Sequence, residues 1–362
     1  MSFQMPTYQA PDFSKPAFTD APCAKSAPAP RDGVAPENYH ATSIYPEYFK
    51  LGGTWMLAGE SRMDCVAVLE PGGGIATKEF RNLRGGDEVI LGRTEDGSEG
   101  IYVHYDGFSK AGASDGSFAF RTGRSRETAF SKDYDSLYEL LKHEREHGFI
   151  AWVLGPACSF DADARAAMSG LIENGFANVV MAGNALATHD LEAALLRTAL
   201  GQDVYTQQPM PNGHYNHIDV INKVRGCGSI PQFIETYGVK DGIVNSCVRN
   251  EVPLVLAGSI RDDGPLPEVI GNVYDAQDRM RSYIRQATTV ICLATQLHTI
   301  ATGNMTPSFR VIDGQVRPVF LYCVDISEFV TNKLRDRGSL AVTSIVTNVQ
   351  DFLVHLWRGT AK

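Results

Sequence analysis

The sequence contains no long hydrophobic run. No stretch of its 362 residues approaches the roughly 20 uncharged apolar residues that a membrane-spanning helix needs. The first thirty residues also lack the basic start and apolar centre of a signal peptide. These two absences predict a cytoplasmic protein. With 43% hydrophobic residues, the chain can bury a substantial core, and its length predicts two domains.

An excess of positive charge and close cysteine pairs are also absent. The formal net charge of -9 argues against binding to nucleic acid or to a membrane surface, because both require clustered positive charge. None of the seven cysteines forms a C-x-x-C pair, and several lie in apolar runs where a buried, reduced thiol is expected. Neither a disulfide framework nor a thiolate zinc site is predicted. Small-molecule chemistry and protein partners remain.

Composition divides the chain into three regions. Residues 1–40 are rich in Pro, Ala and Ser, which predicts a flexible arm. Residues 41–130 contain short alternating runs separated by PGGG and EDGSEG, which predicts a small β-rich domain. The PGGG segment lacks the Lys-Ser/Thr of a phosphate-binding loop, so it favours a hairpin turn.

Residues 131–362 alternate between helical and strand-like periodicity. DYDSLYELLKHEREHG and DADARAAMSGLIENG have helical spacing, whereas FIAWVLGPA and ANVVMAGNA are strand-like. Such alternation is typical of one α/β domain, in which helices cover both faces of a parallel sheet.

The HEREH segment, His143–His147, matches the H-E-x-x-H pattern of zinc proteases. We do not interpret it as a zinc site, because its helix is highly charged and ends at Gly148, directly before a strand. The pattern favours a solvated helix face whose basic residues lie at the negative end of the helix dipole. No metal is expected.

Small and polar residues follow several of the predicted strands. Ligands of open parallel sheets bind beyond the carboxyl ends of the strands, and small residues let a flat cofactor approach the backbone there. The sequence therefore predicts a dinucleotide-binding surface, although it has no G-x-G-x-x-G motif. The candidate cofactor-binding positions are Gly155, Pro156, Ala157, Gly183, Asn184, Ala185, Gly258, Ser259, Ala294, Thr295 and Ile326.

Several polar residues at these strand ends have two interpretations. Asp325 can bind ribose hydroxyls or cap the following helix. Asn184 can support a turn, and His189 with Asp190 can form an N-cap, or these residues can contact the nicotinamide end of a cofactor.

The GHYNH segment contains two further candidate histidines. His214 and His217 flank Asn216 in a connection rich in Gly and Pro. They can be ordinary loop histidines, or one of them can face a substrate as a general base. The residues alone leave both interpretations open.

Together, the segments GNALATHDLEAAL, GHYNHIDVIN, VPLVLAGSIRDDGPLPEV, LATQLHTIATGN and VDISEFVTNKLRDRGS resemble the archaeal-type ornithine cyclodeaminase family. That family includes the C-terminal part of the arginine dihydrolase/ornithine cyclodeaminase proteins. It carries the region named after lysine-oxoglutarate reductase and saccharopine dehydrogenase (LOR/SDH). The resemblance covers most of residues 150–355, and RMDCVAVL and LRGGDEVILG extend it weakly into the N-terminal domain. It implies a Rossmann-like, NAD-binding fold similar to that of deoxyhypusine synthase.

The resemblance implies bound NAD and conversion of L-ornithine to L-proline with release of ammonia. Asp262 and Asp263 would hold the cationic substrate, and Arg261 would bind its carboxylate or brace the aspartates. The alternative is an Asp-Gly turn with Arg261 at the surface. The reaction needs a base with a pKa near neutrality. The available imidazoles are His214, His217 and His298.

The resemblance also suggests cofactor contacts for Asp190, Asn216, Asp263 and Asn348, and substrate contacts for Asn304 and Lys333. It implies a homo-oligomer, more readily a tetramer than a dimer.

The sequence departs from the family pattern at a few positions. CSFDADA replaces a loop that in the family has His, Thr and paired glycines, Asn348 replaces an aspartate, and Gln296 replaces a methionine. NAD binding is therefore better supported than ornithine specificity. The alternatives are a NAD-dependent amine or amino-acid dehydrogenase or transferase, and a NAD-binding regulatory protein without turnover.

Overall fold

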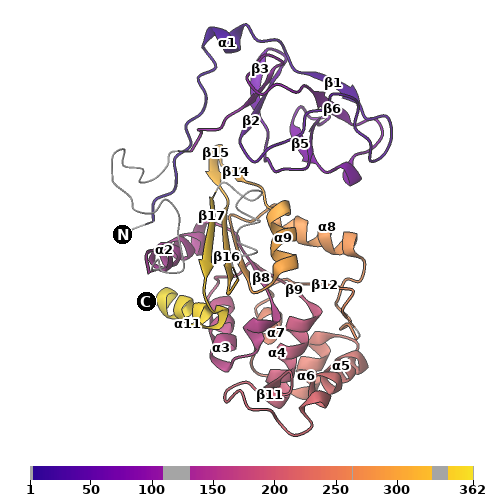
Figure 1. The fold of residues 1–362 in the computed structure, drawn as a ribbon, viewed down its shortest axis with the longest axis vertical. Coiled ribbons are helices and arrows are strands. Elements are labelled where there is room, and N and C mark those ends of the chain that lie inside the picture. The colour runs from indigo at the N-terminus through magenta and orange to yellow at the C-terminus, as the bar shows by residue number, and fades with distance from the viewer. Residues whose placement is uncertain (1–2, 109–130, 263, 328–340, 362) are drawn as a thin grey trace.

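The computed structural model describes residues 3–108, 131–262, 264–327 and 341–361. An α/β domain forms the C-terminal part, and small antiparallel sheets form the N-terminal part (Figure 1). No helix in these ranges has the length and apolar content that crossing a bilayer requires.

One six-stranded parallel sheet organises the C-terminal part, as the sequence predicted. Its strand order is β12-β9-β8-β13-β16-β17. The chain starts in the middle at β8, proceeds to the β12 edge, and then returns to β13 on the other side of β8. In doubly wound sheets, ligands generally bind at the carboxyl ends of the strands near the point where the strand order reverses, which here lies at β8 and β13. The strands are β8 (Ile150–Leu154), β9 (Val179–Gly183), β12 (Leu254–Ala257), β13 (Thr289–Leu293), β16 (Phe320–Asp325) and β17 (Ala341–Val346).

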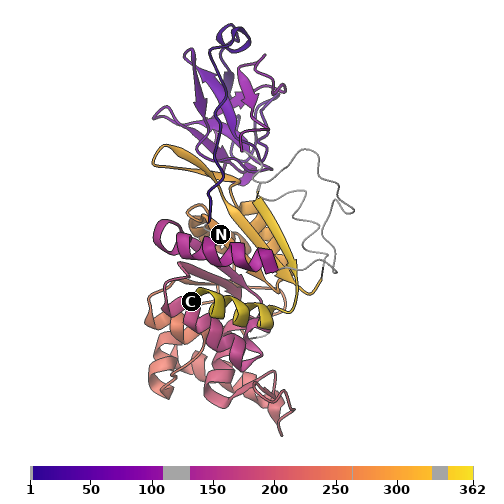
Figure 2. The same cartoon turned by 90° about the vertical axis from the view of Figure 1, so that its left-hand side faces the viewer.

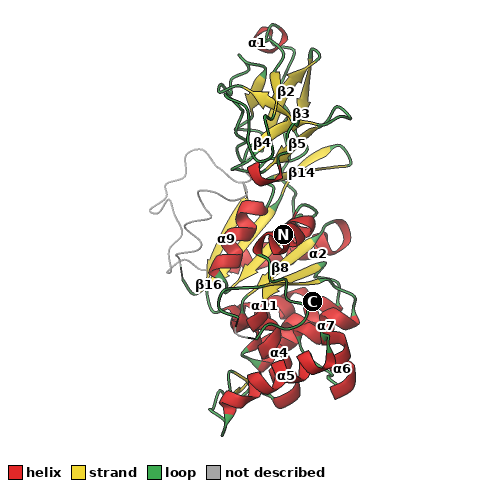
Figure 3. Ribbon diagram, turned by 90° about the vertical axis from the view of Figure 1, so that its right-hand side faces the viewer, coloured by secondary structure: helices red, strands yellow, loops and turns green. Residues whose placement is uncertain are grey.

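Helices cover both faces of this sheet (Figure 3). Alternation along β8 explains the two layers: Trp152 and Leu154 pack into one hydrophobic cluster, and Val153 packs into the other. The first face is covered by α2 (Ser131–His147), α3 (Ala162–Glu173), α4 (Asn184–Leu196) and α11 (Val349–Thr360), and the second by α8 (Val273–Ile284) and α9 (Gln296–Met305).

Between α4 and β12 lies a helical segment that the sequence reasoning missed. It consists of α5 (Asn216–Cys227), α6 (Ile230–Tyr237) and α7 (Ile243–Arg249), and it follows the short strands β10 (Thr198–Ala199) and β11 (Gln202–Asp203) and the 3-10 helix η3 (Gly213–Tyr215). Local signals for α6 were present in GCGSIP. Gly228 ends α5 with a φ of 84°, and the Ser229 side chain accepts a hydrogen bond from Gln232 N at the start of α6.

The N-terminal part contains a four-stranded and a three-stranded antiparallel sheet. The first has the order β1 (Lys25–Pro28), β6 (Glu88–Leu91), β4 (Val66–Leu69), β5 (Ile75–Lys78). The second has the order β3 (Thr54–Leu57), β2 (Glu47–Leu51), β7 (Ile101–Val103). A hairpin turn joins β4 to β5 across the PGGG segment, where Glu70 N donates to Gly74 O, and this confirms the predicted turn.

The prediction that residues 1–40 form a flexible arm is wrong for much of that segment. Lys25–Pro28 pairs with β6 at the edge of the first sheet, where the missing N–H of Pro28 is tolerated. The short helix α1 (Pro16–Thr19) is also held against β2, because Lys50 Nζ donates to the carbonyls of Phe18, Thr19 and Ala21.

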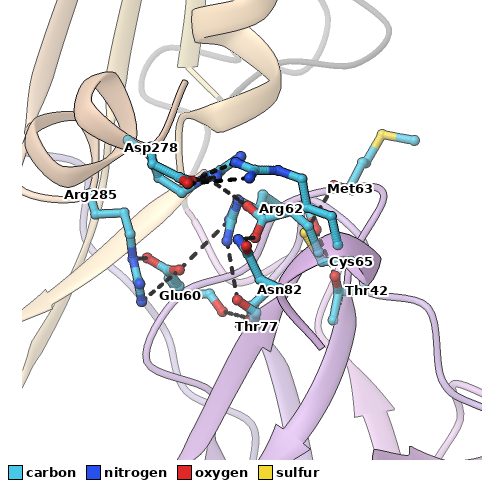
Figure 4. Close-up of polar contacts among 12 residues, drawn as sticks. Thr42, Glu60, Arg62, Met63, Cys65, Thr77, Asn82, Asp278 and Arg285 are labelled. Carbon is cyan, nitrogen blue, oxygen red and sulfur yellow. Dashed lines mark hydrogen bonds and ion pairs between the residues drawn. The ribbon is translucent and has the colours of Figure 1, made fainter. Parts of the chain in front are cut away.

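Ion pairs join the N-terminal sheets to α8. Arg281 Nε lies 2.7 Å from Glu79 Oε1. Arg285 Nη2 lies 3.1 Å from Glu60 Oε1 (Figure 4). The β14–β15 hairpin (Phe309–Ile312 and Gln315–Pro318) extends from the α/β domain toward the same sheets (Figure 2). Polar contacts therefore join the two parts of the chain.

Glu144 corrects the view of the HEREH helix as a solvated face. Its side chain is fully buried, accepts a hydrogen bond from Thr288 Oγ1, and lies 2.6 Å from Arg317 Nη2. Glu144 therefore joins α2 to Thr288, which directly precedes β13, and to Arg317 of the β14–β15 hairpin. His147 is 61% exposed, in agreement with a surface role for that histidine.

Candidate active site

The ends of β8 and β13 pack directly against each other. A Cβ atom on Gly155 would lie 1.9 Å from the Ala294 carbonyl oxygen, and Ala294 itself has a φ of 49°. On Gly258, a Cβ would lie 2.9 Å from Ile270 O. From the sequence, we attributed the small size of these residues to the close approach of a cofactor. The structure gives a sufficient reason within the protein, since neighbouring backbone already occupies the space.

Two helix N-termini at this edge of the sheet have no side-chain cap. Helix α4 follows β9 and α9 follows β13, and neither has an acidic residue in its first turn. By contrast, Asp161, Asn272 and Asn348 cap α3, α8 and α11. Uncapped N–H groups at a helix N-terminus are donors suited to phosphate. The donor set therefore fits a dinucleotide, with Gly183 and Thr295 as the residues that precede the two helices.

Other predicted cofactor contacts lie along the same edge. Pro156 and Ala157 belong to the 3-10 helix η2 (Pro156–Ser159) after β8, where the Ala157 carbonyl accepts a hydrogen bond from Gln350 Nε2. Asp325 ends β16, and its carboxylate accepts a hydrogen bond from Ser327 N. Ile326 follows it and is 71% exposed.

His298 lies in the first turn of α9, close to the end of β9. A Cβ built on Gly183 would lie 3.1 Å from His298 Cε1, so the imidazole covers this glycine. Thr295 Oγ1 is 3.3 Å from His298 Nδ1. Burial lowers the pKa of His298, and the nearby charge of Asp262 opposes this shift only in part. A histidine with a lowered pKa is neutral at pH 7 and can accept a proton.

Next to this edge, a cavity of about 700 Å³ opens between α4, α5 and the loop after β12. Its volume is typical of small-molecule sites. The lining combines acidic, basic, imidazole and apolar groups. It consists of Asn184, Ala185, Thr188, His189, His217, Ile218, Ile221, Asn222, Arg225, Arg261, Asp262, Gly264 and Pro265.

Backbone-directed hydrogen bonds hold the loop after β12 in place over the cavity. The Asn184 side-chain oxygen accepts from Leu266 N at 3.0 Å, and Asp262 Oδ2 accepts from Ser259 N at 2.8 Å. Asp262 and Arg261 line the cavity. Asp263 and Lys333 lie outside the described residues.

Two histidines from different helices face the cavity side by side. The rings of His189 on α4 and His217 on α5 have centroids 5.9 Å apart. His217 Nδ1 is buried and has no hydrogen-bond partner among the described residues. His217 was among the predicted bases. The sequence reasoning considered His189 only as an N-cap or cofactor contact, and the signal it missed was the Glu192 side chain one helical turn further on.

Asp190 does not belong to this site. Its side chain is fully buried and lies 2.8 Å from Arg165 Nε, and its second oxygen accepts from Val244 N at 2.8 Å. Successive residues on a helix differ by about 100° in direction, so Asp190 faces α3 and α7 when His189 faces the cavity. The predicted cofactor contact of Asp190 is therefore replaced by a structural ion pair.

Four other predicted residues have placements that change their interpretation. His214 does not line the cavity, and its ring lies 4.3 Å from that of Tyr215. Asn304 is exposed in the last turn of α9, about 9 Å along the helix from His298. Asn216 Nδ2 donates to Thr198 Oγ1, and Asn348 caps α11. None of the four lines the cavity, and the cofactor contacts of Asn216 and Asn348 and the substrate contact of Asn304 stay predictions.

The cysteines form no disulfide, and the described residues form no metal-ligand cluster. All seven cysteines are free, and burial raises the pKa of the Cys158 thiol to about 12. Among residues 3–108, 131–262, 264–327 and 341–361, no group of three or more His, Cys, Asp or Glu side chains is placed to hold a metal ion.

Comparison with known proteins decides the family. The family model described as arginine dihydrolase ArgZ-like, C-terminal, Rossmann fold matches residues 136–356. The chain belongs to the ornithine cyclodeaminase family. It is 38% identical over 331 residues to an ornithine cyclodeaminase of Methanopyrus kandleri, covering 91% of this chain and 76% of that protein. A similar enzyme of Methanothermobacter thermautotrophicus is 38% identical, with 90% and 76% covered.

Solved structures of family members share the fold. A LOR/SDH protein from Methanococcus maripaludis S2 has a TM-score of 0.84 at 35% identity, covering 94% of this chain and 98% of that one. A complex of AgrE with ornithine and NAD+ has a TM-score of 0.58 at 31% identity, covering 94% of this chain and 46% of AgrE. The predicted Rossmann-like fold and the predicted family are both confirmed.

Proposed function

We propose that this protein is a NAD-dependent ornithine cyclodeaminase, which converts L-ornithine to L-proline and ammonia. The observation that supports this proposal best is the composition of the cavity. Asp262 and the arginines 225 and 261 line one pocket together with two imidazoles, beside helix N-termini suited to a dinucleotide. A substrate with two amino groups and one carboxylate needs such a mixture of charges.

Different residues of the chain would bind the substrate and the cofactor. Asp262 would hold an ammonium group of the substrate, and Arg225 or Arg261 would bind its carboxylate. The N-termini of α4 and α9 would bind the cofactor phosphates. Bound NAD+ would supply a reversible hydride acceptor, so that hydride leaves the α-carbon before ring closure and returns to it afterwards.

Apolar side chains in the same cavity would limit the access of water. Ile218, Ile221 and Pro265 line the pocket next to the charged groups. Exclusion of water matters, because an imine formed from the substrate would otherwise hydrolyse to a keto acid. The low water content expected here also strengthens the attraction between Asp262 and a bound ammonium group.

The residues that depart from the family pattern do not line this pocket. Cys158 and Ser159 are fully buried, and Ser159 Oγ donates to Pro156 O. Asp161 caps α3 by accepting from Ala164 N. The altered CSFDADA loop thus changes internal packing more than it changes the cavity wall, which supports ornithine as the substrate.

The direct test is to incubate the purified protein with L-ornithine and NAD+ and to quantify proline, ammonia and NADH. We expect proline and ammonia in equal amounts, with no net NADH. Net NADH would instead support the alternative, a NAD-dependent amine or amino-acid dehydrogenase. Nucleotide binding without turnover of any amine would favour a regulatory protein.

We also propose that the protein assembles into a homo-oligomer, more readily a tetramer than a dimer. Large apolar side chains remain exposed at the start of α8 and α9, where Val273 is 60% exposed and Leu297 72% exposed in the single chain. Contacts between copies would cover them. Light scattering at micromolar concentration measures the assembly, and a monomer would refute it.

A further inference from the structure

A buried carboxylate contacts one of the cavity histidines. His189 Nδ1 lies 2.9 Å from Glu192 Oε2, and both residues project from α4 one turn apart. The Glu192 side chain is completely buried, and that of His189 is 9% exposed. His189 lines the cavity, whereas Glu192 does not. The carboxylate therefore lies behind the imidazole as seen from the pocket.

Donors from three other groups fix the Glu192 carboxylate. Thr198 Oγ1 donates to Glu192 Oε1 at 2.8 Å, Gly201 N donates to the same oxygen at 3.1 Å, and Leu200 N donates to Oε2 at 3.2 Å. Each oxygen of the Glu192 carboxylate thus accepts at least one hydrogen bond from a donor other than His189, and an ionised carboxylate has no proton to donate. A carboxylate held in this way cannot turn away from the imidazole.

The network also determines which histidine nitrogen carries the proton. Thr198 Oγ1 accepts a hydrogen bond from Asn216 Nδ2 at 2.8 Å, so its own hydrogen remains for Glu192. Because Glu192 can only accept, His189 Nδ1 must be the donor. In the neutral ring, Nε2 is then unprotonated and can accept a proton.

We propose that His189 is the general base of the site and that Glu192 is the positioning residue that orients it. This inference rests on the proposed cyclodeaminase function. His189 Nε2 takes one proton from a substrate ammonium group, which leaves the amine with its lone pair. The imidazolium formed keeps its Nδ1 hydrogen bond to Glu192 and later returns the Nε2 proton to the departing amine, so that ammonia leaves.

Other charged groups face the same imidazole. The ring of His217 on α5 lies 5.9 Å from that of His189 between centroids, and Arg225, Arg261 and Asp262 line the same cavity. His217 lacks a partner for its buried Nδ1, whereas His189 has a carboxylate fixed by three further donors. The surroundings of His189 therefore favour it as the base over His217.

Glu192→Gln tests the positioning role. The glutamine side chain keeps the size of glutamate, but its amide can donate to His189 Nδ1 and so favours the tautomer with the proton on Nε2. We expect kcat for proline formation to fall about 100- to 10,000-fold, with little change in KM for ornithine. The control is Glu235→Gln at an exposed position of α6, which should leave kcat unchanged.

His189→Ala should lose a similar factor in kcat, and added imidazole should restore part of it, because the free base can enter the space left by the ring. In wild-type protein, the acidic limb of the kcat profile should follow one titrating group, and this limb should be absent from His189→Ala. Full kcat in Glu192→Gln or in His189→Ala would overturn the assignment.

A measurement that needs no turnover separates this inference from the proposed function. Nitrogen NMR of protein labelled at histidine reports the tautomer of His189, with His189→Ala used to assign its signals. We expect the neutral ring protonated on Nδ1. An Nε2-protonated ring in wild-type protein would overturn the dyad even if the protein makes proline, and absence of proline from ornithine would refute only the proposed function.

Discussion

Replacing Asp190 by Asn should destabilise the protein without removing a cofactor contact. The Asp190 carboxylate has 0% exposed side-chain surface and is paired with Arg165, whose side chain is 8% exposed. The second carboxylate partner of Arg165, Asp241, has a side chain that is 67% exposed. Solvent screens the pair with Asp241, so Asp190 supplies most of the charge compensation for the buried guanidinium.

The size of the effect follows from this burial. Breaking a buried ion pair by removing one partner costs about 3 to 5 kcal/mol, because the other charge stays buried and uncompensated. Asn can keep the hydrogen bond from Val244 N through its side-chain oxygen, and Asp241 retains part of its attraction for Arg165. We therefore expect a loss of about 3 kcal/mol in the free energy of unfolding.

Urea unfolding at pH 7 measures this loss, and mass spectrometry of the denatured protein measures the NAD that was bound. Asp203→Asn on the surface is a control for the loss of one carboxylate. An Asp190→Asn protein with wild-type stability but no bound NAD would refute the reasoning. That result would restore Asp190 as a cofactor ligand.

Three further changes have defined outcomes. Burial raises the pKa of Glu79, but the Arg62 and Arg281 charges outweigh it and lower this pKa from its usual 4.5 to about 2. The contribution of Glu79 to stability is therefore present above pH 4.5 and is lost as the pH falls toward 2. Glu79→Gln should therefore flatten the dependence of unfolding free energy on pH in that window, as urea titrations at several pH values would reveal. Asp262→Asn should raise KM for ornithine about 10- to 100-fold, since a charged hydrogen bond is lost, and steady-state kinetics that show an unchanged KM would contradict its role. His147→Ala should leave both NAD content and turnover intact, and metal release with loss of activity would revive the zinc interpretation of HEREH.

The sheet was predictable because periodicity reflects burial on two faces. In IAWVL, every side chain of β8 is buried, and neighbouring residues enter different hydrophobic clusters. The helices α5 to α7 were missed for the opposite reason. Ile218 on α5 is 53% exposed and lines the cavity. Some apolar residues of NHIDVINKV therefore face the cavity and not the core, and the segment lacks the single apolar face by which a helix is recognised in a sequence.

Backbone topology alone makes part of the site predictable. The loop after β12 lies at the carboxyl edge of the sheet whatever its side chains do, and Arg261 and Asp262 of this loop line the cavity, while their roles toward a substrate stay predictions. The prediction was wrong where helical direction decides. Asp190 is adjacent to His189 in sequence but faces Arg165, and no strand-end argument distinguishes the two directions.

Helix α4 shows why long-range partners determine the chemistry of this site. It is buried from Asn184 to Ala193, except at Ala185, so it has no solvated face where polar side chains can remain unpaired. Each buried polar group must then find a partner elsewhere in the protein. Asn184 bonds to Leu266 N, Asp190 to Arg165, and Glu192 to Thr198 and Gly201. The sequence NALATHDLEAAL predicts a helix, but whether its carboxylates hold a cofactor, an arginine or a histidine depends on which residues the rest of the chain brings to each side of it.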